Sequence, residues 1–100
     1  MIKLQEVFES IAKYKVDKNA YAQPQMRTRK TYVRRDCLLN PDYIVASYPH
    51  HFESSVEREM LDSTFTEEDR FSRIILDGNS FRSSEIIVNM SFEELSDRLT

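Results

Sequence analysis

The chain has 100 residues, 40% of them hydrophobic, which suits one folded domain spanning residues 1–100. No apolar run approaches the roughly 20 residues that cross a bilayer, acidic residues interrupt the first ten positions, and Cys37 has no second cysteine to pair with. These features disfavour a membrane-bound or disulfide-bonded secreted protein, so we expect a cytoplasmic one. The net charge of −3 divides into +6 over residues 1–35 and −9 over 36–100, a separation that can guide self-association or attract an anionic ligand.

The first third of the chain is predicted to be a helix followed by a linker. Leu4, Val7, Phe8 and Ile11 follow the spacing i, i+3, i+4, i+7, which predicts an amphipathic helix over residues 2–14. Residues 15–26 have no period and contain a proline, so they are predicted to be a linker.

The middle of the chain changes from a β pattern to a helical one. Residues 31–39 and 43–48 are rich in β-branched, aromatic and aliphatic side chains, and Asn-Pro-Asp at 40–42 predicts a turn between two strands. Residues 49–70 lose this pattern. Capping-box spacing, Ser54 with Glu57 and Thr64 with Glu67, predicts one or two short helices there.

The last third is predicted to form a hairpin and a helix. Residues 71–77 and 84–90 have strand character with apolar side chains on both faces, so we expect the middle insert or a second subunit to cover the second face. Ser91 and Glu94 form a capping box that opens a C-terminal helix. The predicted fold class is α+β: a mainly antiparallel sheet of about four strands, N- and C-terminal helices and a short helical insert.

Gly78, the only glycine, lies in the predicted hairpin loop beside Asn79. Glycine and asparagine are the residues that most readily adopt a positive φ, so Gly78 is predicted to begin the bend. The six loop residues 78–83 exceed the two of the tightest hairpins, and the extra length is predicted to present Phe81 and Arg82.

Catalytic and metal chemistry have little support in the sequence. Cys37 could be a nucleophile with His50 or His51 as its base, but it also fits a small apolar strand residue, and no oxyanion-hole motif accompanies it. The histidines beside Glu53 lack zinc-site spacing, and the acidic residues 67–69 lack the order of a calcium loop. We therefore expect no enzyme, no metal and no cofactor.

Two groups of residues are candidates for binding. Residues 27–35 hold five cations around Tyr32, a combination that suits phosphate and a stacked base. The same segment could instead be a basic edge strand that resists pairing or contacts the acidic insert of its own or a neighbouring chain. The hairpin 71–82 combines phenylalanine and arginine, which can anchor an interface or hold a ring and a phosphate, although Phe71 could equally be core. The predicted ligand-binding residues are Arg27, Arg29, Arg34, Arg35, Phe71, Arg73, Asn79, Phe81 and Arg82.

Two families share features with the chain. "YVRRDCLLNPDYIVASYP" and "FSRIILDGNSFRSSEIIVNMSFEELSDRL" resemble the small FlbD/SwrD-type bacterial proteins over roughly residues 32–48 and 71–99. The chain departs from them by its N-terminal segment, its acidic insert and a longer hairpin loop. The Asn-Pro-acid turn and "FSRIILDGN" are also similar in outline to phage anti-defence proteins that sequester the cyclic nucleotide signal of the Thoeris system.

These resemblances imply a non-enzymatic bacterial or phage binding protein. It would be a homo-oligomer that sequesters a nucleotide-like ligand, held across a subunit boundary, or a partner protein. A nucleic-acid regulator and a small enzyme using Cys37 with a histidine are the alternatives. The sequence pI near 5.4 weighs against bulk nucleic-acid binding.

Overall fold

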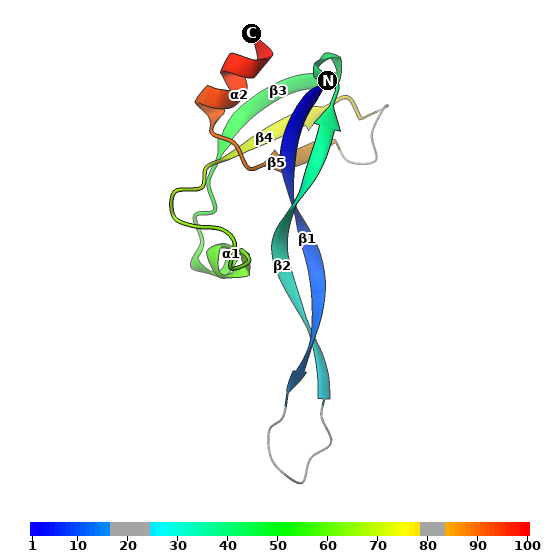
Figure 1. Ribbon diagram of the computed structural model, residues 1–100, viewed down its shortest axis with the longest axis vertical. Helices are drawn as coiled ribbons and strands as arrows, with labels where there is room; N and C mark the ends of the chain where they lie inside the picture. The colour runs from blue at the N-terminus through cyan, green and yellow to red at the C-terminus, as the bar shows by residue number, and fades with distance from the viewer. Residues whose placement is uncertain (17–24, 79–83) are drawn as a thin grey trace.

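A computed structural model describes residues 1–16, 25–78 and 84–100 of the chain. In the described part, one antiparallel sheet has the strand order β2-β1-β5-β4-β3 and is accompanied by two helices (Figure 1). The elements are β1 (Ile2–Val16), β2 (Gln25–Leu39), the 3-10 turn η1 (Pro41–Tyr43), β3 (Ile44–His50), α1 (Ser55–Met60), β4 (Phe71–Leu76), β5 (Glu85–Val88) and α2 (Phe92–Leu99). The α+β class is confirmed, with five strands in place of about four.

The predicted N-terminal helix over residues 2–14 is wrong, because these residues form β1. Leu4 and Val7 are 2% and 4% exposed. In a strand, residues three apart point to opposite faces, and both faces of this sheet are covered at β1. The spacing i, i+3 is therefore also met by a strand buried on both sides. The predicted linker 15–26 is wrong at its ends, which belong to β1 and β2, and its centre lies outside the described residues.

The main core lies between the sheet and α2. It is formed by Leu4, Leu39, Ile74, Leu76, Val88, Met90 and Leu95. The predicted cap of α2 is confirmed, since the backbone N–H of Glu94 donates to Ser91 Oγ at 3.2 Å. A buried polar group is satisfied within this core, because Ser72 Oγ donates to the carbonyl of Met90 at 2.8 Å.

The middle insert covers the second face of the sheet. The sequence predicted that either this insert or a second subunit would do so. Phe52 and Phe65 from the insert pack on Phe71 of β4, with ring centroids 4.9 and 5.7 Å apart. The insert also bonds the edge of β2, where the N–H of Asp62 donates to the carbonyl of Tyr32 at 3.0 Å.

The insert forms one short helix, which agrees with the prediction of one or two. Ser54 caps α1 by accepting from the N–H of Glu57 at 3.0 Å, as its capping box predicts. A helix opened by Thr64 is absent. Thr64 instead donates its N–H to Asp62 Oδ1 at 2.8 Å in a turn, because a short acidic side chain competes with helical hydrogen bonds.

The turn and hairpin predictions are confirmed in outline. Asn40 accepts from the N–H of Asp42 at 3.0 Å within η1, but β2 and β3, which this turn joins, lie at opposite edges of the sheet. The hairpin of β4 and β5 pairs Ile74 with Ile86. Gly78 lies in a turn that follows β4, as predicted, although none of the described residues has a positive φ.

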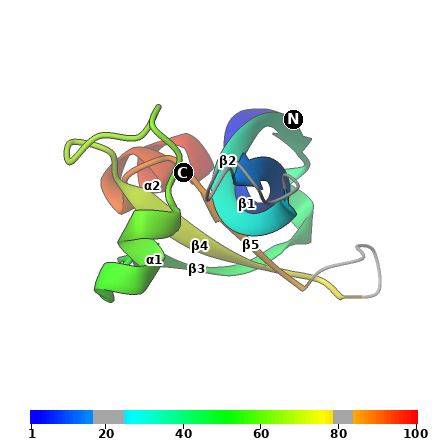
Figure 2. The ribbon, with the colours of Figure 1, turned by 90° about the horizontal axis from the view of Figure 1, so that it is seen from below.

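A long two-stranded arm leaves the body of the protein. β1 pairs with β5 only at Glu6 and Val7, whereas its pairing with β2 continues from Phe8–Val33 to Val16–Gln25. We call residues 8–16 and 25–33 the arm. It projects from the body and gives the molecule a length of 61 Å against 31 and 21 Å (Figures 1 and 2). Within the described ranges, neither helix has the length or apolar character needed to span a membrane.

Candidate functional site

The arm concentrates positive charge on a protein that is otherwise acidic. Its two strands carry five Lys/Arg and one acidic residue, a balance of +4, so the rest of the chain carries −7. The cations are Lys13, Lys15, Arg27, Arg29 and Lys30. At about 3.4 Å per residue, the nine pairs of the arm extend about 30 Å. The Debye length in physiological salt is about 8 Å, so the far end of the arm is screened from the acidic body.

The base of the arm is fixed to the insert. Arg29 Nη2 donates to the carbonyl of Glu59 at 3.1 Å, and Thr31 Oγ1 donates to the carbonyl of Met60 at 2.9 Å. Arg29 nevertheless remains exposed. The backbone of Arg27 pairs with Tyr14 farther along the arm, and its side chain lies outside the described part.

Arg34 is tied into the body rather than free for a ligand. Its Nη1 donates to Asn89 Oδ1 at 2.6 Å and lies 3.8 Å from Asp69 Oδ1. Its Nη2 donates to the carbonyl of Thr64 at 2.6 Å, and the guanidinium lies 4.3 Å from the Phe65 ring centroid. Arg34 therefore joins β2 to Asn89, which follows β5, and to the acidic insert. This is the contact with the chain's own insert that the sequence left open as an alternative to ligand binding.

Arg35 and Cys37 lie on the other face of β2. Arg35 Nε donates to Glu6 Oε1 at 2.8 Å, and its guanidinium stacks 4.1 Å from the Phe8 ring centroid. Burial, and then the charge of Glu6, raise the pKa of the Cys37 thiol, which favours the unreactive protonated form. His50 lies near Tyr32, since both rings contact Phe52, and Tyr32 is five residues from Cys37 along β2, or about 17 Å. No proton transfer joins the two, so the catalytic pairing of Cys37 with His50 has no geometric support.

The remaining predicted residues divide between core and surface. Phe71 belongs to the aromatic cluster of the insert. Arg73 lies over the Tyr48 ring at 5.0 Å, with its Nε 3.9 Å from Glu85 Oε1. Asn79, Phe81 and Arg82 lie outside the described residues. The predicted residues that the structure describes thus fall at separate places and do not form one pocket.

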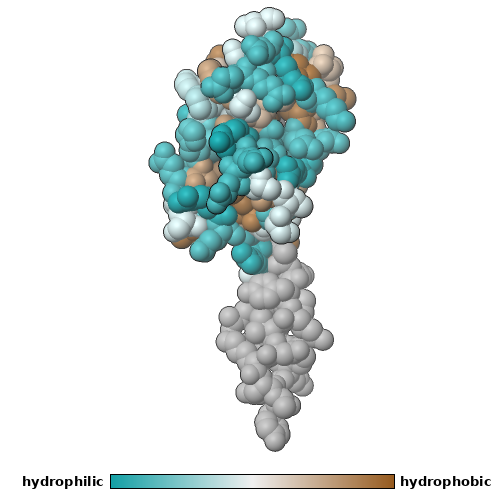
Figure 3. Space-filling model, turned by 60° about the vertical axis from the view of Figure 1, so that its left-hand side comes forward, coloured by the Kyte–Doolittle hydropathy of each residue, from teal (hydrophilic) through white to brown (hydrophobic). Residues whose placement is uncertain are grey.

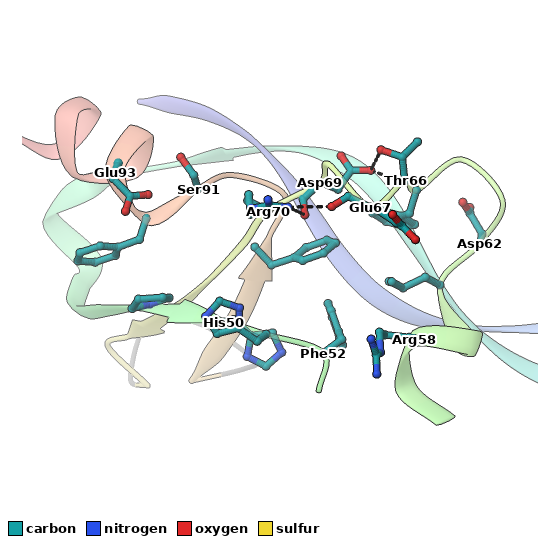
Figure 4. Close-up of a pocket in the computed structure, with 16 residues that line it drawn as sticks. His50, Phe52, Arg58, Asp62, Thr66, Glu67, Asp69, Arg70, Ser91 and Glu93 are labelled. Atoms are coloured by element: carbon teal, nitrogen blue, oxygen red, sulfur yellow. Dashed lines mark hydrogen bonds between the residues drawn. The ribbon is translucent and has the colours of Figure 1, made fainter. Parts of the chain in front are cut away.

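Sequence reasoning missed a groove between the insert and the start of α2. It encloses about 1110 Å³, with Phe52 and Phe71 among its lining and Glu67 and Glu93 at its rim (Figure 4). From this side the body is mostly hydrophilic with small apolar patches (Figure 3). The signal for the groove is the alternation of phenylalanines and acidic residues between positions 52 and 71. A pattern of that kind does not show which residues share a cavity.

The site has no metal-binding character in the described ranges. No three His, Cys, Asp or Glu side chains there gather closely enough to hold an ion. Asp62 has its pKa lowered by hydrogen bonds from Thr64, so that carboxylate is already occupied by its own turn.

Comparison with known proteins finds no matching family model, no matching curated protein and no matching solved structure. Fold and geometry therefore define the class: a small α+β protein with a basic β-arm and an acidic body.

Proposed function

We propose that this protein is a non-enzymatic binding protein whose arm engages the phosphate backbone of nucleic acid. The single observation that supports this proposal best is the projecting two-stranded arm, with a charge of +4, on a body of −7. Among the alternatives that the sequence left open, this geometry favours the nucleic-acid regulator.

The shape of the arm suits a duplex. The major groove of B-DNA is about 12 Å wide and admits a two-stranded β-ribbon. Lysine and arginine on such a ribbon bond phosphate oxygens and displace condensed counterions, which supplies affinity without sequence specificity. The acidic body does not oppose this contact, because most of the arm lies beyond the Debye length from the sheet.

Fluorescence anisotropy with a labelled duplex tests the proposal. With about four phosphate contacts, the logarithm of the association constant should fall against the logarithm of salt concentration with a slope of about −3.6. Lys13→Gln/Lys15→Gln should weaken binding and make the slope shallower by about 2. Lys3→Gln is the matched control, since Lys3 is an exposed lysine on the same strand outside the arm.

Two results would contradict the proposal. One is binding that does not respond to salt. The other is an arm variant that binds as tightly as the Lys3→Gln control, because the arm would then contribute no phosphate contact.

Sequestration of a small nucleotide-like anion is a second candidate. It is supported by Arg73, whose guanidinium is stacked on Tyr48 and whose side chain is 40% exposed beside the hairpin. This candidate predicts that Arg73→Gln abolishes binding of a mononucleotide by isothermal titration calorimetry, whereas the arm variant leaves it unchanged. The reverse pattern would exclude it.

A further inference from the structure

The insert gives the groove a surface opposite in charge to the arm. Residues 51–70 carry seven acidic residues and two arginines, a balance of −5. Glu67 and Glu93 line the groove, are exposed and form no ion pair within the described part of the chain. The groove itself is lined by four acidic residues and by two arginines, Arg58 and Arg70, a balance of −2. It therefore combines a moderate negative charge with an aromatic wall formed by Phe52 and Phe71.

The groove and the arm of the same chain cannot meet. The groove lies between the insert and α2, whereas the arm runs away from the body and past α1 (Figure 1). The register of nine cross-strand pairs keeps the arm extended. A basic ribbon in this groove must therefore come from another molecule.

We propose that the groove of one copy receives the basic arm of a second copy. The charges of +4 on the arm and −2 on the groove lining are complementary, which favours the encounter and selects this partner over an acidic one. The methylene stems of lysine and arginine can pack on the aromatic wall while their charged ends meet the rim carboxylates. Reciprocal insertion closes a two-fold dimer in which each copy supplies one arm and one groove.

The free edge of β3 is a weaker route to a dimer. β3 has no charged residue, which would favour pairing with a second strand. However, Pro49 supplies no N–H and a register shift at Val45 interrupts the ladder. Both features protect sheet edges against pairing.

The proposed dimer does not depend on nucleic-acid binding, but it uses the same arm. Where both occur, nucleic acid and the second copy compete, so a duplex would dissociate the dimer. The acidic groove of one copy would then take the place of the phosphate backbone for the arm of the other copy. The dimer dissociation constant would set the concentration of arms that are free to bind nucleic acid.

A charge-swap experiment without nucleic acid tests the dimer. Sedimentation velocity should show that Lys13→Glu/Lys15→Glu and Glu67→Lys/Glu93→Lys each raise the dimer dissociation constant at least about tenfold. Mixing the two variants should restore a dimer, since each reversed arm then meets a reversed groove and each native arm a native groove. Asp42→Lys/Asp97→Lys, which reverses two exposed acids outside the groove, should leave the dimer unchanged.

Three results would overturn the dimer: a wild-type monomer at every concentration, variants that still self-associate, or a mixture that stays monomeric. Each is independent of the anisotropy assay, so the arm can bind DNA while this inference fails. Conversely, a restored mixed dimer together with salt-insensitive DNA binding would contradict only the proposed function.

Discussion

Replacing Arg34 by alanine separates a structural role from a ligand-binding one. The substitution removes bonds to Asn89 and Thr64 and the ion pair with Asp69. Hydrogen bonds to a charged group are worth about 1.5–3 kcal/mol each, and the partly buried Asn89 would lose a partner. Because such contributions are not additive, we expect the free energy of unfolding to fall by about 2–4 kcal/mol.

Urea denaturation followed by circular dichroism measures this loss. Arg35→Ala is the matched control, since the Arg35 side chain is 58% exposed and its pair with Glu6 should contribute at most about 1 kcal/mol. Arg34→Lys should give an intermediate loss, because lysine keeps the charge but lacks the fork that bonds two partners. The folded Arg34→Ala protein should bind DNA within about twofold of wild type.

The reasoning fails if Arg34→Ala destabilises the protein no more than Arg35→Ala does. A large loss of DNA affinity at unchanged stability would also refute it and would return Arg34 to the ligand-binding residues.

Three further predictions concern the body. Gly78→Ala should raise the free energy of unfolding by about 0.4–1 kcal/mol in urea titrations, because its φ is not positive and an added Cβ meets Ser84 Cβ at an ordinary 3.9 Å; destabilisation would contradict this. Leu95→Ala should cost about 2–5 kcal/mol in the same assay, since Leu95 is fully buried, and a smaller loss would mean that α2 is dispensable. Burial, and then Arg73, lower the pKa of His50 below its ordinary 6.5. The unfolded chain therefore binds that proton first, and stability should fall as the pH drops through about 6.5; a His50→Gln variant with the same pH profile of melting temperature would refute this.

The sequence predicted those elements whose local signals agree with their packing. The hairpin around Ile74 and Ile86, the cap at Ser91 and the insert as cover for the second face follow from alternation, capping chemistry and apolar residues on both faces. β1 was mispredicted because Leu4 and Val7 are buried on opposite faces, which reproduces a helical spacing. No local pattern distinguishes the two cases. What decides between them is pairing with β2, a contact across more than twenty residues of chain.

The candidate site was harder to predict for a related reason. Five cations in residues 27–35 are one cluster in sequence, but the strand and its neighbours divide them. Arg34 and Arg35 point to opposite faces and find partners within the body, whereas Arg29 and Lys30 stay exposed on the arm. A strand reverses the direction of its side chains at every residue. Charge density along a chain therefore overstates the charge available on any one surface.

The division of cations also explains how the arm can project at all. An isolated two-stranded hairpin is marginally stable in water, so its base must be held. Arg35 over Phe8 anchors one face of the hairpin where it leaves the sheet, and Arg29 and Thr31 bond the insert along its edge. The body-facing arginines thus stabilise the ribbon that carries the remaining cations. Both proposed partners, the phosphate backbone and the acidic groove of a second copy, would therefore contact the arm beyond this anchored base.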